Sequence, residues 1–441
     1  MVPRESQEFE KKIGIWFFLT EIEGIGGAIK TIPADFYVRE VTNRKEQEEG
    51  KYLIVELTKE NWDTHNVIRE LSRRLRVSRN RIGFAGTKDK FAVTKQKISI
   101  WDTTAKELEH VKITDVSLKI LGRSNKAVSL GDLYGNEFEI VIRNLKAKRE
   151  AIKDKISVIT NEIENSGGIC NFFGIQRFGI SRPITHVVGK HLITSTIKDA
   201  VMSYLSDIFP EESEETKQAR RLCKNGELKE CLKIMPLRYE RAMLNELVKS
   251  KENYRSAFSA LPQNLQKLFV HAYQAYLFNL VLSHRIEHNL PFHEAVVGDM
   301  VCFRNEFGLA NPGMVEKVTT DKLDAMNRLI KRNRAFVTAP IVGTETEFAD
   351  GEIGEIERKV LEDEAIDLND FNIETIPELS SKGTRRPIIV PVTISKEEIS
   401  EDELNPGLQK AKLNFFLPKG TYATVLLREY TKTRDGSITR R

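Results

Sequence analysis

This 441-residue sequence lacks long hydrophobic runs, a recognisable secretion signal and clustered cysteines. The apolar stretch Ile13–Leu19 falls far short of the ~20 residues that span a bilayer, so no membrane protein is expected. The charged first residues do not form a secretory signal. The cysteines lack CxxC pairing and lie in no close Cys/His set with zinc-ligand spacing. They are Cys170, Cys223, Cys231 and Cys302. We predict buried thiols in a reducing cytoplasm, without a disulfide or a metal.

Nucleotide-binding motifs are missing as well. Gly24–Thr31 superficially suggests a P-loop, but Ile29 stands where that motif needs a glycine before its lysine. The GxGxxG fingerprint of dinucleotide-binding proteins is absent, and no glycine-rich loop after a strand offers a methyl-donor site. The sequence therefore predicts neither nucleotide-driven chemistry nor a methyltransferase.

Charge is unevenly distributed along the chain. The formal net charge is only +4, with 40% hydrophobic and 30% charged residues, which is typical of a soluble protein of two to four domains. Arg69–Lys97 holds ten basic residues against two acids, or +8, whereas Glu345–Glu378 holds thirteen acids against two bases, or −11. A basic concentration favours a phosphate-backbone ligand, although a solvated helix face gives the same pattern.

Hydrophobic periodicity predicts mixed α and β structure, with strand-rich ends around a helix-rich middle from about residue 190 to 288. A helix is predicted after Thr64, which can cap it. A second amphipathic helix is predicted at Lys148–Glu164. The expected strands include Phe36–Val41, Tyr52–Thr58, Val93–Trp101, Ala127–Leu130, Phe138–Arg143 and Ile388–Ile394.

The segment from Gly83 to Lys97 reads GFAGTKDKFAVTKQK and carries the clearest chemical signal. Asp89 lies between Lys88 and Lys90 on a turn between two predicted strands. A carboxylate among cations stays ionised near neutral pH and can act as a nucleophile on a sugar C1′. The alternative is an ordinary turn aspartate between two solvated lysines.

Five blocks of the sequence occur in an order that resembles one known family. They read IKTIPADF at 29–36, GFAGTKDKFAVTKQ at 83–96, GNEF at 135–138, NFFGIQRFG at 171–179 and LPKGTYAT at 417–424. Together they extend over nearly the whole chain. They resemble the blocks of the TruD family of tRNA pseudouridine synthases, and the long helical stretch at 190–261 looks more like archaeal members than compact bacterial ones.

The resemblance implies an α+β protein of two domains. A pseudouridine-synthase catalytic domain, with a mixed or antiparallel sheet and helices, would consist of residues 1–167 and 387–441. An α/β TRUD domain would be inserted at 168–386. The boundaries agree with the change from strand-rich to helix-rich sequence.

The family implies isomerisation of uridine to pseudouridine in tRNA, at position 13 of the D arm, by a cytoplasmic monomer without cofactor or metal. Asp89 would be the catalytic carboxylate, and Lys30 would hold it ionised. Whether the carboxylate attacks C1′ or removes the C2′ proton stays open. A non-catalytic RNA-binding or chaperone protein of the same fold is the main alternative.

The target uridine has to leave its stack and be held by an aromatic face and hydrogen bonds. By resemblance, this role falls to Phe36, Asn136, Phe138 and Tyr422, the last of which is usually phenylalanine in the family. The two phenylalanines could also be core residues, and Asn136 a turn residue. Contacts with the RNA backbone are predicted for Arg73, Arg74, Lys88, Lys90 and Arg177. Arg177 could instead be a structural arginine.

Overall fold

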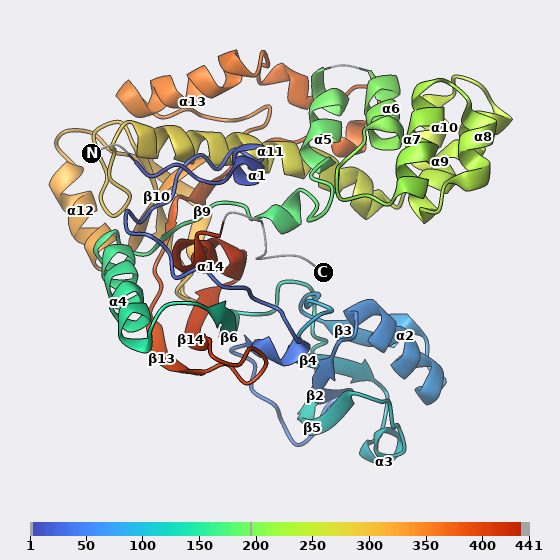
Figure 1. Ribbon diagram of the computed structural model, residues 1–441, viewed down its shortest axis with the longest axis horizontal. Helices are drawn as coiled ribbons and strands as arrows, with labels where there is room; N and C mark the ends of the chain where they lie inside the picture. Colours follow the sequence, from blue (N-terminus) through green and yellow to red (C-terminus); the bar gives the residue numbers. More distant parts are fainter. Residues whose placement is uncertain (1–2, 195, 434–441) are drawn as a thin grey trace. The chain divides into compact units, whose positions relative to one another are not determined.

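Two units divide the chain in the computed structural model, which describes residues 3–194 and 196–433 (Figure 1). Residues 3–19 and Cys170–Ile389 form one, the helical unit. Thr20–Ile169 and residues 390–433 form the other, the sheet unit. The predicted division places residues 1–19 with the N-terminal strands, but the described part of this segment packs within the helical unit. The end of the predicted 387–441 segment lies outside the described residues.

The sheet unit is built on an eight-stranded sheet in the order β13-β14-β6-β1-β4-β2-β5, with β3 paired to β4. β1 and β4 are parallel, and the other neighbours are antiparallel. The predicted mixture of α and β structure is thereby confirmed. The strands are β1 (Phe36–Val41), β2 (Tyr52–Glu60), β3 (Ile82–Phe84), β4 (Val93–Trp101), β5 (Val116–Ser124), β6 (Gly135–Leu145), β13 (Ile394–Glu401) and β14 (Gln409–Pro418). The helices are α2 (Thr64–Leu75), α3 (Ala105–Glu109), α4 (Arg149–Asn165) and α14 (Ala423–Thr431).

Helix α2 covers part of this sheet because its apolar side chains recur at helical spacing. Val67, Ile68 and Leu71 are buried in a cluster with side chains of β2, β3 and β4. Thr64 was predicted as the cap, but the side chain of Asp63 caps the helix by accepting a hydrogen bond from the Asn66 amide at 3.1 Å. Thr64 is the first helical residue, and its hydroxyl is used elsewhere.

Two of the predicted strands are wrong. Ala127–Leu130 forms no strand, because the Val128 amide donates to the Ser99 hydroxyl at 2.8 Å and not to a neighbouring backbone. Ile388–Ile394 contains only the short strand β12 (Ile389–Val390) and the first residue of β13, with Pro391 between them. A proline cannot donate to a strand ladder, which explains the break.

The helical unit is organised around α11 (Gln263–Glu287), which is buried along most of its length. Its sheet has the order β11-β10-β8-β9 and is antiparallel. The strands are β8 (Met300–Arg304), β9 (Ala310–Lys317), β10 (Ala335–Ile341) and β11 (Thr384–Pro387). The two-residue β7 (Ile169–Cys170) lies at the boundary, with Ile169 in the sheet unit and Cys170 in this one. The other helices are α1 (Glu8–Lys11), α5 (Thr185–Thr194), α6 (Ile197–Ser206), α7 (Glu214–Lys224), α8 (Leu228–Ile234), α9 (Arg238–Lys249), α10 (Tyr254–Ser259), α12 (Leu323–Lys331) and α13 (Gly351–Asp363). None of the helices described is long and apolar enough to cross a membrane.

One cysteine prediction is corrected. Cys223 on α7 and Cys231 on α8 form a disulfide that joins the two consecutive helices. The eight-residue separation gave no recognisable motif, yet the turn between the helices brings the Cα atoms to 5.5 Å, which is disulfide distance. Cys170 and Cys302 are buried as predicted, and burial raises the pKa of the Cys302 thiol to about 11.

Candidate active site

The parallel pairing of β1 and β4 brings together two segments that are distant in sequence. Tyr37 pairs with Val93 near the start of both strands. Because parallel neighbours begin at the same edge of a sheet, the segments that precede them meet there. Lys30 lies before β1 and Asp89 lies before β4.

Lys30 and Asp89 form an ion pair at this edge. The Lys30 ammonium lies 2.8 Å from Asp89 Oδ2, and the two side chains are 16% and 45% exposed. The same ammonium lies 4.1 Å from the centre of the Phe36 ring, which is cation–π distance. The cation is thus largely enclosed, whereas the carboxylate is open to a ligand. These three residues were all predicted as site residues from the sequence.

Buried polar side chains form hydrogen bonds with the backbone of the Asp89 loop. Lys59, on β2, is fully buried and donates from Nζ to the carbonyl oxygen of Asp89 at 2.7 Å. The Lys88 amide donates to the hydroxyl of Thr64 at 3.0 Å, and the Gln96 side chain donates to the Gly86 carbonyl at 3.0 Å. Burial lowers the pKa of Lys59 to about 8.

Lys59 was not predicted as a site residue, because it directly follows the predicted strand Tyr52–Thr58 and carries no motif. One signal could have identified it: the two-residue alternation of strand side chains places this lysine on the buried face. An unpaired buried lysine is costly, so its hydrogen bond to the loop carbonyl compensates part of that cost.

The two lysines beside Asp89 have different surroundings. Lys88 was predicted to contact the RNA backbone, but its side chain is only 7% exposed and its ammonium lies 2.9 Å from the buried carboxylate of Glu40. Lys88 therefore anchors the loop to β1. Lys90, by contrast, is exposed.

Hydrogen bonds also hold the backbone on both sides of Lys30. Lys30 has φ +58°, a left-handed conformation that is costly for a residue with a Cβ atom. Just upstream, Ala28 exchanges two backbone hydrogen bonds with Arg143. Downstream, the buried carboxylate of Asp35 accepts from Arg143 Nε at 2.8 Å and from the Ile32 amide at 3.0 Å. The surrounding contacts therefore hold Lys30 in its unusual conformation.

Three of the predicted base-binding residues share one face of the sheet. Val38 pairs with Phe138 and Glu40 pairs with Asn136, so the two-residue period places Phe36, Asn136 and Phe138 on the same side. Phe36 and Phe138 contact edge to face at 6.2 Å. The Phe36 side chain is buried, in line with the alternative of a core residue, whereas Phe138 is half-buried.

The side chain of Asn136 has unusual surroundings. Its Oδ1 atom is buried and accepts no hydrogen bond from any described residue. Buried polar atoms are nearly always paired, so an unpaired one in this place is a candidate ligand contact. Tyr422, the fourth predicted base-binding residue, is half-buried and lies at the N-cap of α14, shortly after the end of β14.

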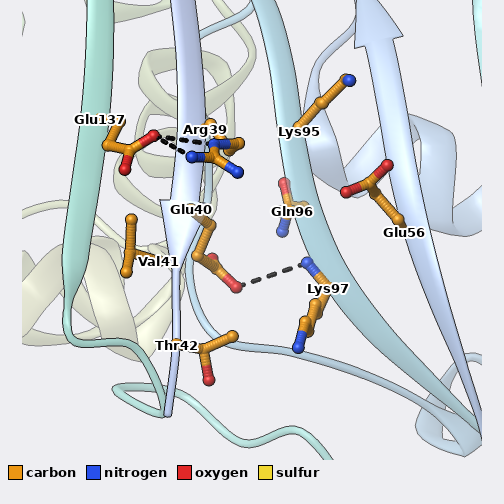
Figure 2. A pocket seen from close by; sticks show the side chains of 9 residues that line it. All are labelled: Arg39, Glu40, Val41, Thr42, Glu56, Lys95, Gln96, Lys97 and Glu137. Atoms are coloured by element: carbon orange, nitrogen blue, oxygen red, sulfur yellow. Dashed lines mark hydrogen bonds and ion pairs between the residues drawn. The ribbon is translucent and has the colours of Figure 1, made fainter. Parts of the chain in front are cut away.

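A hollow of about 220 Å³ lies on the sheet between β1, β4, β2 and β6 (Figure 2). Two of its carboxylates are already paired: Arg39 Nε donates to Glu137 at 2.8 Å, and the Glu40 carboxylate lies 2.9 Å from the Lys88 ammonium. Neither Lys30 nor Asp89 lines it. We therefore assign it no part in the chemistry.

The predicted RNA-backbone arginines are distributed over both units. Arg73 and Arg74 lie on α2, 73% and 40% exposed, and both are bonded to Glu70, at 2.8 and 2.7 Å. These arginines lower the pKa of Glu70 to about 2. Arg177 lies in the helical unit, in the 3-10 turn Ile175–Arg177, with its guanidinium 5.5 Å from the ring of Phe173.

Comparison with known proteins gives one consistent result. The family model "tRNA pseudouridine synthase D (TruD)" matches residues 12–430. A Methanosarcina mazei protein named "Probable tRNA pseudouridine synthase D" is 53% identical over 97% of this chain and 98% of its own length. A protein of the same name from Thermococcus sibiricus is 38% identical over 94% of this chain and 97% of its own.

A solved structure agrees with these sequences. The crystal structure of a candidate tRNA pseudouridine synthase D (TruD) from Methanosarcina mazei matches with a TM-score of 0.87 at 53% identity, over 97% of this chain and 98% of that one. The sequence blocks described above agree with both comparisons. The chain therefore belongs to the TruD family of tRNA pseudouridine synthases.

Proposed function

We propose that this protein isomerises uridine to pseudouridine in tRNA, at position 13 of the D arm, with Asp89 as the catalytic carboxylate and without a cofactor. The observation that carries the proposal is the Lys30–Asp89 pair, an enclosed cation on an accessible carboxylate. The family membership of the chain supports the substrate class.

The reaction breaks the bond between N1 and C1′, turns the uracil and joins C5 to C1′. The proton on C5 is lost and N1 takes one up, so the atoms balance without any co-substrate. Asp89 acts either by attacking C1′ or by removing the C2′ proton. In both routes Asp89 has to be ionised and fixed in position. Lys30 binds its carboxylate and keeps it ionised, and Lys59 binds its backbone carbonyl and fixes its position.

The flipped uracil binds on the sheet face that carries Phe36, Asn136 and Phe138, and Tyr422 is its fourth contact. The unpaired Asn136 Oδ1 supports this assignment because it can accept a hydrogen bond from the N3–H of uracil. The half-buried Phe138 ring offers a stacking surface, and it is itself stacked on Phe415 at 5.2 Å.

The sheet unit acts as the catalytic domain, because Lys30, Asp89 and Asn136 all belong to it. The helical unit contains the inserted TRUD domain together with residues 3–19. Backbone contacts to tRNA come from Arg73, Arg74 and Lys90 of the catalytic domain and from Arg177 of the inserted one, while Lys88 stays with Glu40. We expect the protein to work as a monomer in the cytoplasm.

Carbodiimide mapping of pseudouridine by primer extension tests the proposal. An unmodified tRNA transcript with uridine at position 13 is incubated with the protein alone, and a matched transcript with cytidine there is the control. We expect one new stop that reports pseudouridine at position 13 in the first transcript, one nucleotide to its 3′ side, and none in the second. A stop elsewhere would refute the position, and tight binding without any stop would favour the non-catalytic RNA-binding alternative.

A further inference from the structure

The C-terminal turns of α11 carry a group of side chains that takes no part in the proposed reaction. His284, Glu287 and His288 each present a ligand atom, and these atoms lie within 4.8 Å of one another. Throughout residues 3–194 and 196–433, no other group of three or more histidine, cysteine or carboxylate side chains comes as close together.

The spacing of these residues suits a metal ion. Residues three and four apart in a helix lie on the same face, so His284 projects toward both Glu287 and His288. Two histidines at this spacing on one helix are a known zinc-binding arrangement. No zinc site was predicted from the sequence, because cysteine-containing sets were the signal considered there and this group contains no cysteine.

The two imidazole rings are already oriented. The ring of His284 packs edge to face on Trp16, with the ring centres 4.7 Å apart, and its Nδ1 lies 3.0 Å from Glu287 Oε2. His288 Nδ1 lies 3.0 Å from Oε1 of Glu352 on α13, one of the helices that contact α11 in this unit (Figure 1). A carboxylate on the far nitrogen of a ligating histidine is the usual support of a metal site.

The local charge also favours a dication. Glu287 and Glu352 provide two negative charges beside two imidazoles. The neighbouring cation, Arg285, is already paired with Asp299 through two hydrogen bonds of 2.7 and 2.9 Å. Among the described residues, Glu287 and Glu352 are paired only with the two histidines. A divalent ion would therefore balance the charge of these two carboxylates.

We propose that His284, Glu287 and His288 bind a divalent transition metal of the zinc class, with Glu352 orienting His288. Imidazole and carboxylate donors suit Zn²⁺, Co²⁺ or Cu²⁺ better than Mg²⁺ or Ca²⁺, which prefer oxygen alone. Zn–N and Zn–O bonds near 2.0–2.1 Å place tetrahedral ligands about 3.3 Å apart, so modest side-chain rotations from the present separations, which are within 4.8 Å, bring the three atoms to that spacing.

The metal would link α11 to α13 through the hydrogen bond of His288 to Glu352. All of these residues belong to the helical unit, whereas Lys30 and Asp89 belong to the sheet unit. The proposal is therefore independent of the proposed reaction, and its test is a binding measurement and not an activity.

Calorimetric titration of Zn²⁺ into the metal-free, tag-free full chain is the first test. Single-site binding is expected, weakened more than about tenfold in His288→Ala and in Glu287→Gln and less in Glu352→Gln. His288 is the key variant because its half-exposed side chain can be removed with little risk to folding, unlike the buried His284. His110→Ala, at an exposed histidine after α3, is the matched control and should bind like wild type.

Fluorescence quenching by Cu²⁺ locates the bound ion. Trp16 touches His284, so Cu²⁺ should quench its emission, and Trp16→Phe should lose most of that quenching while still binding Zn²⁺. Absence of Zn²⁺ binding in wild type, or binding of unchanged affinity in both His288→Ala and Glu287→Gln, would overturn the proposal.

Discussion

The ammonium of Lys59 lies 2.7 Å from the main-chain carbonyl oxygen of Asp89. This buried lysine holds the backbone of the residue whose carboxylate Lys30 binds from the other side. The position of Asp89 is thus fixed at both its side chain and its backbone, which the proposed catalytic role requires in either route, by attack on C1′ or by removal of the C2′ proton.

The titration of Lys59 predicts a pH-dependent stability. Its pKa is about 8 in the folded protein, against a usual value of 10.5, so between these values the unfolded chain holds more protons than the folded one. The contribution of Lys59 to the free energy of unfolding therefore rises with pH across this window. Urea denaturation at pH 8 and 9.5 should show wild type gaining up to about 2 kcal/mol relative to Lys59→Met. An unchanged difference between the two proteins would contradict the burial of a charged lysine.

Replacing Asn136 should lower the activity without lowering the stability of the protein. Because Asn136 Oδ1 is buried without a partner among the described residues, Asn136→Ala should leave the free energy of unfolding unchanged or raise it by about 1 kcal/mol. Turnover should fall at least about tenfold. Asn414→Ala is the matched control, because Asn414 Oδ1, on β14, is likewise buried and unpaired among the described residues but is not assigned to the uracil. Equal activity losses in both variants would argue against a specific contact of Asn136.

The arginines of α2 predict a particular salt dependence. Arg73→Ala with Arg74→Ala should weaken tRNA binding and flatten the slope of log K against log salt, by roughly one unit for each phosphate that is no longer bound. Both arginines share Glu70, so Glu70→Gln should strengthen binding and steepen the slope. Lys233→Ala removes a similarly exposed cation of an i,i+3 pair on α8 and is the control. A slope unaffected by the changes at Arg73, Arg74 and Glu70 would mean that α2 does not face the RNA.

Lys30 is predicted to act on the chemical step. Lys30→Met should lower kcat about a hundredfold with little change in KM, because the carboxylate loses its cation while the RNA contacts remain. Lys30→Arg should restore part of the rate. Both variants keep a side chain on a backbone at φ +58°, so they carry the same local strain and are a matched pair. A larger effect on KM than on kcat would assign Lys30 to binding.

Much of the sheet unit could be predicted because local pattern and final structure agree there. The predicted strands at Phe36–Val41 and Val93–Trp101 have the observed bounds, and the helix after Thr64 buries the residues that its periodicity indicated. Asp89 and Lys30 were predicted as partners from the family blocks, but the reason for their contact, the parallel pairing of β1 with β4, is a long-range feature that local pattern does not contain.

The features that sequence reasoning missed all depend on tertiary contacts. Lys59 has its role only because the Asp89 loop lies over β2, and Lys88 turns away from solvent only because Glu40 is buried beside it. Cys223 and Cys231 pair because two helices turn back on each other. In each case a neighbour distant in sequence or a turn decides the outcome, and local propensity has no information about it.

The proposed reaction depends most on Asp89, and one comparison of two proteins tests the role of this residue directly. Wild type and Asp89→Asn are incubated with the same unmodified tRNA transcript, binding is measured by filter retention, and pseudouridine is measured after a single turnover. We predict equal tRNA affinity and no detectable pseudouridine with Asp89→Asn, because the amide is nearly isosteric but is neither a nucleophile nor a base. Pseudouridine formed by Asp89→Asn at the wild-type rate would remove Asp89 from the chemistry and contradict the account.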